Sequence, residues 1–311
     1  MFADLVLEGG GVKGIALVGA ISVLEERGYE FRRVAGTSVG AIVGSLVAAD
    51  ARAAQLEEIM RAVDYRRFQD GPRWRNLLLG KAAALLFDQG IYEGQYLKDW
   101  LGERLGQLGV RTFADLRYDD PQRPPDPECA YRLVVMTCDL SQGRVRRLPW
   151  EYGHYRLPQA DQPVVDAVRA SMSIPFFYKP TRLTDAGGRD CWLVDGAMLS
   201  RFPIDVFDVP PGLEPRWPTF GIKLSAAPGT ASEVHDTVSM SWAMLNAMTG
   251  FYDRAHIDEA AAAARTVVID TGTVRATDFG LDREVQDLLF RKGREAALAF
   301  HSGGATGFSS L

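Results

Sequence analysis

Hydrophobic positions along the chain alternate between short continuous runs and segments of helical spacing. Residues 4–7 form an apolar run, and the apolar residues between 15 and 28 then recur near helical spacing. A second short apolar run covers residues 31–35. This order predicts a strand, a helix and a second strand, and the loops that follow the two strands open at the same edge of a sheet.

The same alternation continues toward the C-terminus. Further strands are predicted at 131–138, 143–148, 191–194, 219–224 and 265–269. Two successive helices are predicted within 41–63, and further helices at 96–105, 164–171, 234–253 and 282–300. Strands that alternate with helices predict an α/β fold with a mostly parallel sheet covered on both faces. We expect one domain over residues 1–301 and a frayed tail at 302–311. The arginines of the 143–148 strand, Arg144, Arg146 and Arg147, are expected to be solvated.

Residues 65–91 allow two interpretations. Aromatic residues and arginines are interleaved over residues 65–75, which indicates a basic and aromatic surface, and a nearly continuous apolar segment follows at 76–87. That segment is too short to span a bilayer. A buried helix beneath a solvated loop explains the pattern, and so does a lipid-facing part of the molecule.

A Gly-x-Ser-x-Gly sequence with Ser38 at its centre joins the second apolar run to the next helix. A serine on a sharp strand-to-helix turn has a strained backbone and a raised hydroxyl, so the residues two positions away on either side must be small. Gly36 and Gly40 meet this requirement. The amino end of the helix favours negative charge on the serine oxygen. We interpret the sequence as a nucleophile elbow, although a glycine-rich turn with an incidental serine has the same letters.

A glycine-rich loop at residues 9–14 follows the first apolar run. Its Gly-x-Gly-x-x-Gly spacing also occurs in dinucleotide-binding loops, which require an acidic residue at the end of the second strand. Here that strand runs into residues 36–38, and Glu30 lies before it. We therefore favour an oxyanion hole, in which glycine amides approach a tetrahedral intermediate. A simple tight turn is the third interpretation.

Composition narrows the class of protein. The 311 residues are 47% hydrophobic and 24% charged, and the net charge of -5 gives no reason to expect a nucleic-acid partner. The three cysteines are too widely spaced for a disulfide framework or a zinc site. The sequence shows neither the pattern of a secretory signal nor an apolar run of membrane-spanning length. These features favour a cytoplasmic protein.

Asp195 ends a predicted strand and is followed by Gly196 and Ala197. An aspartate in this position is most often a turn former. Histidine is the usual base in serine hydrolases, but none of the four histidines of this chain lies in a glycine-rich or strand-end context suited to a triad; a triad with one of them folded into the site is the alternative. The four histidines are His154, His235, His256 and His301.

Four sequence blocks, in this order along the chain, resemble the patatin-like phospholipases, which are serine lipid acyl hydrolases built on a three-layer α/β/α sandwich. The blocks are residues 9–14, 36–40, 170–175 and 195–197. The resemblance extends over nearly the whole chain, and the four blocks together are specific.

The resemblance implies that Ser38 is the nucleophile and Asp195 the general base of a catalytic dyad. It also implies that loop amides around Gly10 and Gly11, Val12 included, form the oxyanion hole. The remaining motif residues support these groups: Gly9, Lys13, Gly14, Gly36, Gly40 and Gly196. This chemistry requires no metal and no cofactor.

The chain departs from the family pattern at two positions near the implied base. Ala197 stands where the family often has a second glycine, and Arg201 stands where an asparagine often precedes a Phe-Pro pair. Neither departure alters the implied dyad, but both change the substrate-facing shape around it.

The implied substrate is a phospholipid or a related acyl lipid, and a membrane surface is the expected partner of a peripheral enzyme. An acyltransferase or a thioesterase would use the same serine. A nucleotide-binding oxidoreductase would use the glycine loop instead, and a lipid-binding module would have no catalysis. Covalent labelling of the serine separates the first two activities from the last two.

Overall fold

The computed structural model of the chain describes residues 1–71, 90–118, 130–210, 212–225, 240, 243, 259–276 and 278–302. Its strands are β1 (Phe2–Leu7), β2 (Glu30–Thr37), β3 (Gly90–Tyr92), β4 (Leu133–Asp139), β5 (Arg144–Leu148), β6 (Phe176–Tyr178), β7 (Thr181–Thr184), β8 (Asp190–Asp195), β9 (Thr219–Ser225) and β10 (Thr266–Asp270). Its α-helices are α1 (Gly14–Glu26), α2 (Val39–Ala48), α3 (Ala53–Ala62), α5 (Gln95–Gln107), α6 (Val164–Ser171), α8 (Glu259–Ala264) and α9 (Arg283–Ser302). Short 3₁₀ turns are η1 (Gly11–Lys13), η2 (Tyr65–Phe68), η4 (Phe113–Leu116), η5 (Tyr152–Tyr155) and η6 (Gly196–Met198).

The main sheet has the strand order β10-β9-β1-β2-β4-β8-β7, and β5 pairs with β4. The five strands from β10 to β4 are parallel to one another. Strands β5 and β8 each pair with β4 in antiparallel orientation, and β7 pairs with β8 in the same way. The predicted mostly parallel sheet is thus confirmed for the strands from β10 to β4. Strands β5, β8 and β7 add an antiparallel part next to β4. A separate two-stranded sheet pairs β3 with β6.

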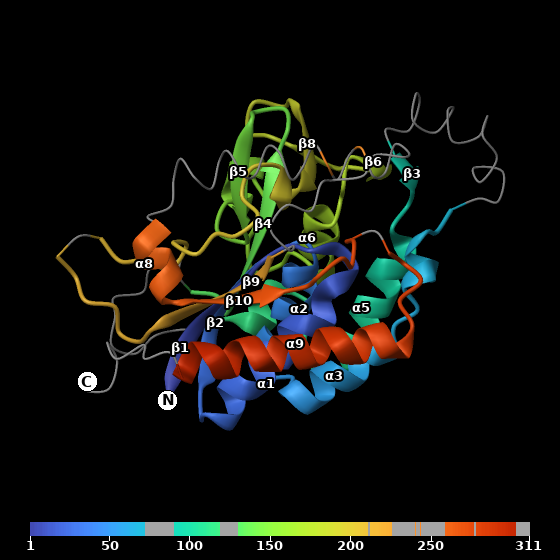
Figure 1. The fold of residues 1–311 in the computed structure, drawn as a ribbon. Coiled ribbons are helices and arrows are strands. Elements are labelled where there is room, and N and C mark those ends of the chain that lie inside the picture. Colours follow the sequence, from blue (N-terminus) through green and yellow to red (C-terminus); the bar gives the residue numbers. More distant parts are fainter. Residues whose placement is uncertain are drawn as a thin grey trace.

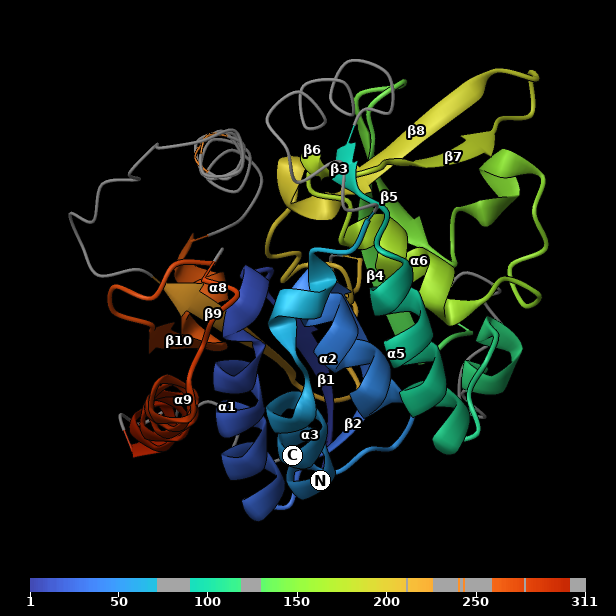
Figure 2. The same cartoon turned by 90° about the vertical axis from the view of Figure 1, so that its right-hand side faces the viewer.

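Helices cover the sheet on both sides. In Figure 1 α1, α3 and α9 lie below the sheet and α8 lies above it. Figure 2 shows α1, α2, α5 and α6 side by side in front of β1, β2 and β4. Strand β4 is buried along its whole length, as is expected for a strand covered on both faces. The predicted three-layer α/β/α fold is confirmed.

Two glycines allow α9 to lie directly on α1. A Cβ atom at Gly19 would stand 2.1 Å from the carbonyl oxygen of Phe290, and one at Gly293 would stand 2.1 Å from that of Ala16. The two helix backbones therefore touch where these residues cross. The C-terminal helix closes the face that carries the βαβ unit.

Several surface expectations were wrong. Arg144 and Arg147 are exposed as expected, but Arg146 is buried, because Glu151 and Gln142 bind its guanidinium and the Tyr155 ring lies 5.9 Å away. Tyr65 and Phe68 of η2 are also buried, although they were expected on a surface, and Phe68 packs against Trp100 of α5. The apolar segment at 76–87, most of the predicted helix at 234–253 and the tail from 303 lie outside the described residues.

Candidate active site

The topology of β4 brings the ends of β2 and β8 together. At Met136 and Thr137 strand β4 pairs with β5 on one edge, so β2 and β8 must share the other edge. On that edge Thr37 of β2 pairs with Met136, and Asp195 of β8 pairs with the next residue, Thr137. Along this edge of β4 the two strands run toward each other, and their last residues meet end to end. Ser38, the next residue after β2, is thereby placed beside Asp195.

Ser38 has the strained geometry of an elbow. Its φ is 56° and its ψ is -125°, outside the region that ordinary residues occupy, and α2 begins at the next residue. A Cβ at Gly36 would lie 2.3 Å from the carbonyl oxygen of Gly40, and one at Gly40 would lie 2.4 Å from that of Leu7. Only glycine fits at both positions, Gly36 because of the backbone of Gly40 and Gly40 because of the backbone of β1.

The block at residues 170–175 connects the two strand ends. The Ser171 hydroxyl accepts a hydrogen bond from the Ser38 amide at 2.9 Å and donates to the carbonyl of Met136 at 2.6 Å. The carbonyl of Ser173 accepts from the Asp195 amide at 2.9 Å. Ser171 and Ser173 thus fix the backbones of Ser38 and Asp195. Met172, which lies between these two serines in the chain, contacts the Ser38 side chain.

Asp195 is fully buried, and one of its oxygens has a partner. Oδ1 accepts from the Ala197 amide at 2.8 Å, while Oδ2 has no hydrogen-bond partner among the described residues. Burial raises the pKa of Asp195 to about 7, against smaller opposite effects of the Ala197 amide, the Ser38 side chain and the charge of Arg201. Gly196 is required here because a Cβ would stand 2.4 Å from the Met136 carbonyl oxygen.

The Ser38 hydroxyl is close to Asp195 without bonding to it in this structure. It donates instead to the Met172 sulfur, at 3.4 Å from Oγ to Sδ. Because the Ser38 side chain lowers the Asp195 pKa and Oδ2 lacks a partner, rotation of the hydroxyl away from Met172 would satisfy the carboxylate. The structure therefore brings the two side chains together, close enough for the Ser38 side chain to lower the pKa of Asp195.

The glycine loop lies against Ser38. A Cβ at Gly9 would stand 3.1 Å from the Ser38 Cβ, and Gly11 has a φ of +60°, with a Cβ there 2.0 Å from the Ala276 carbonyl oxygen. The amides of Gly10 and Gly11 have no acceptor within the described ranges. The Val12 amide differs, since it donates to the Ala276 carbonyl at 3.0 Å.

Lys13 and Gly14 have structural positions behind the loop. Lys13 is buried and donates from Nζ to the Thr271 hydroxyl at 3.1 Å. Burial, and then the nearby charge of Arg201, lower the pKa of Lys13 to about 8. Gly14 begins α1, and a Cβ there would stand 2.6 Å from Val39 at the start of α2. The two helices can therefore approach where both loops meet.

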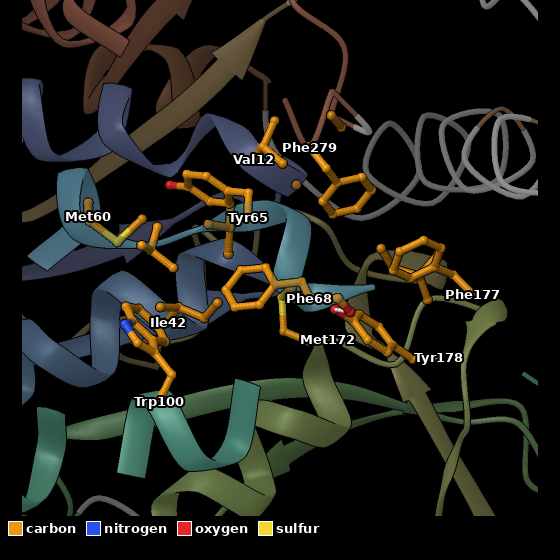
Figure 3. A pocket seen from close by; sticks show the side chains of 15 residues that line it. Val12, Ile42, Met60, Tyr65, Phe68, Trp100, Met172, Phe177, Tyr178 and Phe279 are labelled. Carbon is orange, nitrogen blue, oxygen red and sulfur yellow. Dashed lines mark hydrogen bonds between the residues drawn. The ribbon is translucent and has the colours of Figure 1, made fainter. Parts of the chain in front are cut away.

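An apolar cavity lies on the other side of Met172, the residue whose sulfur contacts the Ser38 hydroxyl (Figure 3). Met172, whose sulfur contacts Ser38, lines it together with residues from η1, α2, α3, η2, α5 and β6. Figure 3 shows Tyr65, Phe68 and Tyr178 among its walls. Its volume of about 20 Å³ is room for little more than a water molecule. No sequence pattern predicts this cavity, because its lining residues come from segments far apart in the chain.

Neither described histidine reaches the candidate residues. His154 contacts Gln142 through its Nε2 at 2.8 Å, and His301 stacks on Tyr29. His235 and His256 lie outside the described residues. Within the ranges that the structure describes, no cluster of His, Cys, Asp and Glu side chains is arranged to hold a metal, and no helix is long and apolar enough to span a membrane.

Comparison with known proteins identifies the family. The patatin-like phospholipase family matches residues 5–208. The uncharacterized protein YqhO of Bacillus subtilis is 32% identical over 305 residues, covering 96% of this chain and 98% of that protein. The lysophospholipase nte1 of Emericella nidulans is 57% identical over 47 residues, but these are 15% of this chain and 3% of that protein. VipD from Legionella pneumophila shares the fold, with a TM-score of 0.56 and 18% identity over 97% of this chain and 67% of that one. The chain therefore belongs to the patatin-like phospholipase family and is a lipid acyl hydrolase.

Proposed function

We propose that the protein cleaves carboxylic ester bonds of phospholipids or related acyl lipids, with Ser38 as nucleophile and Asp195 as the only side-chain base. One observation carries the proposal. A strained serine meets a fully buried aspartate whose Oδ2 has no partner among the described residues, at the side of an apolar cavity.

The reaction begins with attack of the Ser38 oxygen on the ester carbonyl carbon. The hydroxyl proton passes to Asp195 Oδ2 as the carbon–oxygen bond forms, and the negative charge develops on the carbonyl oxygen. Collapse of this intermediate breaks the bond to the leaving alcohol, which takes the proton from Asp195. A water molecule then repeats the sequence on the acyl-enzyme and releases the fatty acid.

The raised pKa of Asp195 makes the first proton transfer practicable. A carboxylate with an ordinary pKa of about 3.9 accepts a hydroxyl proton poorly. Burial moves the pKa to about 7, and a base works best when its pKa lies near the working pH. Asp195 is fully buried and its Oδ2 has no partner among the described residues, so the proposal assigns the serine hydroxyl to it as donor in the first step.

The oxyanion is assigned to the amides of Gly10 and Gly11. These amides lack acceptors among the described residues, and the loop that carries them lies against Ser38. The start of α2 adds the positive end of a helix dipole to the same place. Val12 would have to leave the Ala276 carbonyl before it could contribute.

The acyl chain is assigned to the apolar cavity. Met172 separates the cavity from the Ser38 hydroxyl, and its unbranched thioether side chain can change rotamer at low cost. Because the resting cavity is small, entry of an acyl chain must push Met172 and its neighbours aside. That movement would also release the Ser38 hydroxyl from the sulfur and allow it to turn toward Asp195.

The substrate is proposed to be taken from a lipid surface. Phe176 is 42% exposed and has a φ of +67°, which is strained for an aromatic residue. It directly precedes Phe177 and Tyr178, which line the cavity. An aromatic side chain held outward beside the proposed acyl site suits the interfacial region of a membrane.

Covalent labelling tests the assignment. The wild-type protein should react with a fluorophosphonate and hydrolyse a soluble short-chain ester, and Ser38→Ala should lose both while remaining folded. Ser45→Ala removes another fully buried serine, in α2, and should retain both activities. Labelling or hydrolysis that survives Ser38→Ala would refute the nucleophile. A lipid panel with product identification, including an added alcohol acceptor, then distinguishes hydrolysis from acyl transfer.

A further inference from the structure

Arg201 holds both polar backbone groups of Gly9. The Gly9 amide donates to the carbonyl oxygen of Arg201 at 3.2 Å, and Arg201 Nε donates to the carbonyl oxygen of Gly9 at 2.8 Å. Arg201 lies six residues after Asp195 in the chain. One residue thus ties the glycine loop to the segment that carries the proposed base.

Glu8 fixes the guanidinium of Arg201. Its side chain is almost completely buried, and Oε1 lies 3.4 Å from Arg201 Nε. The other carboxylate oxygen accepts from the Leu224 amide on β9, and the Glu8 amide donates to the Ile222 carbonyl at 3.1 Å. The acid is therefore anchored to β9 from both backbone and side chain. A guanidinium paired with such an anchored carboxylate has little freedom to turn.

The bond to the Gly9 carbonyl bears directly on the Gly10 amide. The Gly9 carbonyl and the Gly10 N–H belong to the same peptide group, which is planar and trans, so the two point in opposite directions. A hydrogen bond that fixes the carbonyl also fixes the direction of the N–H. Because the donor is charged, it further polarises the peptide and strengthens the Gly10 N–H as a donor.

We propose that Arg201 is a positioning residue of the oxyanion hole, which orients and polarises the Gly9–Gly10 peptide for the Gly10 N–H to bind the oxyanion. The inference rests on the proposed function of the glycine loop. It gives a role to a residue at which the chain departs from the family pattern. A shorter uncharged side chain would leave the buried Glu8 without its guanidinium partner.

A second pair of a buried acid and an arginine, near the other end of β1, offers a matched comparison. Arg33 pairs with Asp4 on β1, and the side-chain exposures are 14% and 1%, against 18% and 3% for Arg201 and Glu8. Both pairs join a buried acid of the β1 segment to a partly buried arginine. Arg33 binds the carboxylate at the opposite end of β1. Its loss should reproduce the structural effect of losing Arg201 without touching the glycine loop.

The experiment compares Arg201→Gln, Arg201→Lys and Arg33→Gln with the wild type and Ser38→Ala. We would measure kcat and KM for a soluble short-chain ester on the alkaline plateau of the pH profile, the inhibition constant of a trifluoromethyl ketone, and thermal unfolding. Arg201→Gln should lower kcat by about 10- to 100-fold with KM changed less than about twofold, since misdirecting a donor removes part of what deleting it would. The trifluoromethyl ketone forms an oxyanion when Ser38 adds to it, so its inhibition constant should rise as kcat falls.

The controls separate the possible failures. Arg33→Gln should unfold at a lower temperature with kcat within about twofold of wild type. Added guanidinium should restore part of the Arg201→Gln rate, and Arg201→Lys should retain an intermediate rate because a lysine lacks the planar fork. If hydrolysis depends on Ser38 but Arg201→Gln behaves like Arg33→Gln, the inference is overturned and the proposed function stands. Failure of both Arg201 variants to fold would also overturn it in favour of a structural role. Hydrolysis that is independent of Ser38 would overturn the proposed function itself.

Discussion

Replacing Asp195 with asparagine is expected to remove ester hydrolysis and, at pH 8, to stabilise the protein. The reason is that the wild-type carboxyl is fully buried and its pKa rises from 3.8 to about 7. An unfolded chain releases this proton near its ordinary pKa, so between about pH 4 and 7 the folded state binds more protons than the unfolded state. Raising the pH through this range therefore lowers the free energy of unfolding.

The size of the effect follows from the shift. A displacement of about three pKa units corresponds to about 4 kcal/mol at 1.36 kcal/mol per unit, fully expressed above pH 7. Asparagine stays neutral and does not incur this loss. Its amide nitrogen, placed where Oδ2 now lacks a partner, can donate to the Ser38 oxygen. The advantage of Asp195→Asn should grow by roughly 3 kcal/mol between pH 5 and pH 8.

Urea unfolding at pH 5, 6, 7 and 8 measures this difference directly. Asp139→Asn is the matched control, because Asp139 is equally buried but its Oδ2 accepts from the Tyr155 hydroxyl at 2.9 Å. That variant should be less stable than wild type, since it disturbs an existing hydrogen bond. An Asp195→Asn protein that gains no stability over wild type as the pH rises would refute the reasoning. Wild-type kcat/KM should increase with pH through an apparent pKa near 7.

Three further outcomes are expected. Gly11→Ala should lower kcat for a soluble ester by on the order of 10²- to 10³-fold, whereas Gly28→Ala, with a similar φ and nothing within 4 Å of its Cβ, should leave kcat unchanged and affect only stability. His154→Gln should keep most of the activity with or without a chelator, and loss as complete as in Ser38→Ala would indicate a triad. Phe176→Ser should weaken binding to anionic vesicles in flotation while sparing soluble-ester hydrolysis, and equal binding would exclude this residue as a membrane contact; Leu298→Ser on α9 is the exposed control.

The sequence predicted the elements around the site well because their signals are local. The elbow requires glycines two residues on either side of Ser38, and the structure shows backbone atoms at 2.3 and 2.4 Å from where their Cβ atoms would be. The helix at 164–171 and the strand that ends at Asp195 lie where hydrophobic spacing and turn residues placed them. Such steric and periodic signals survive in a single sequence.

Other features of the site depend on which segments meet, and no local signal encodes that. Arg146 looks like a solvated strand residue by its alternation, yet Glu151 and Gln142 from outside β5 enclose it. Tyr65 and Phe68 look like part of a basic surface, yet they form one wall of the apolar cavity. The role of Met172 likewise follows only from the contact between its sulfur and the Ser38 hydroxyl.

The direction of β8 is the clearest case, and it bears on the proposed pairing of Ser38 with Asp195. In a sheet of parallel strands, the carboxyl ends of all strands lie at one edge, and residues from several loops can meet there. Here β8 runs antiparallel to β4, and its last residue arrives at the end of β2 within the sheet. Asp195 therefore reaches Ser38 as part of a strand, and its backbone is fixed by pairing with Thr137 and by the Ser173 carbonyl.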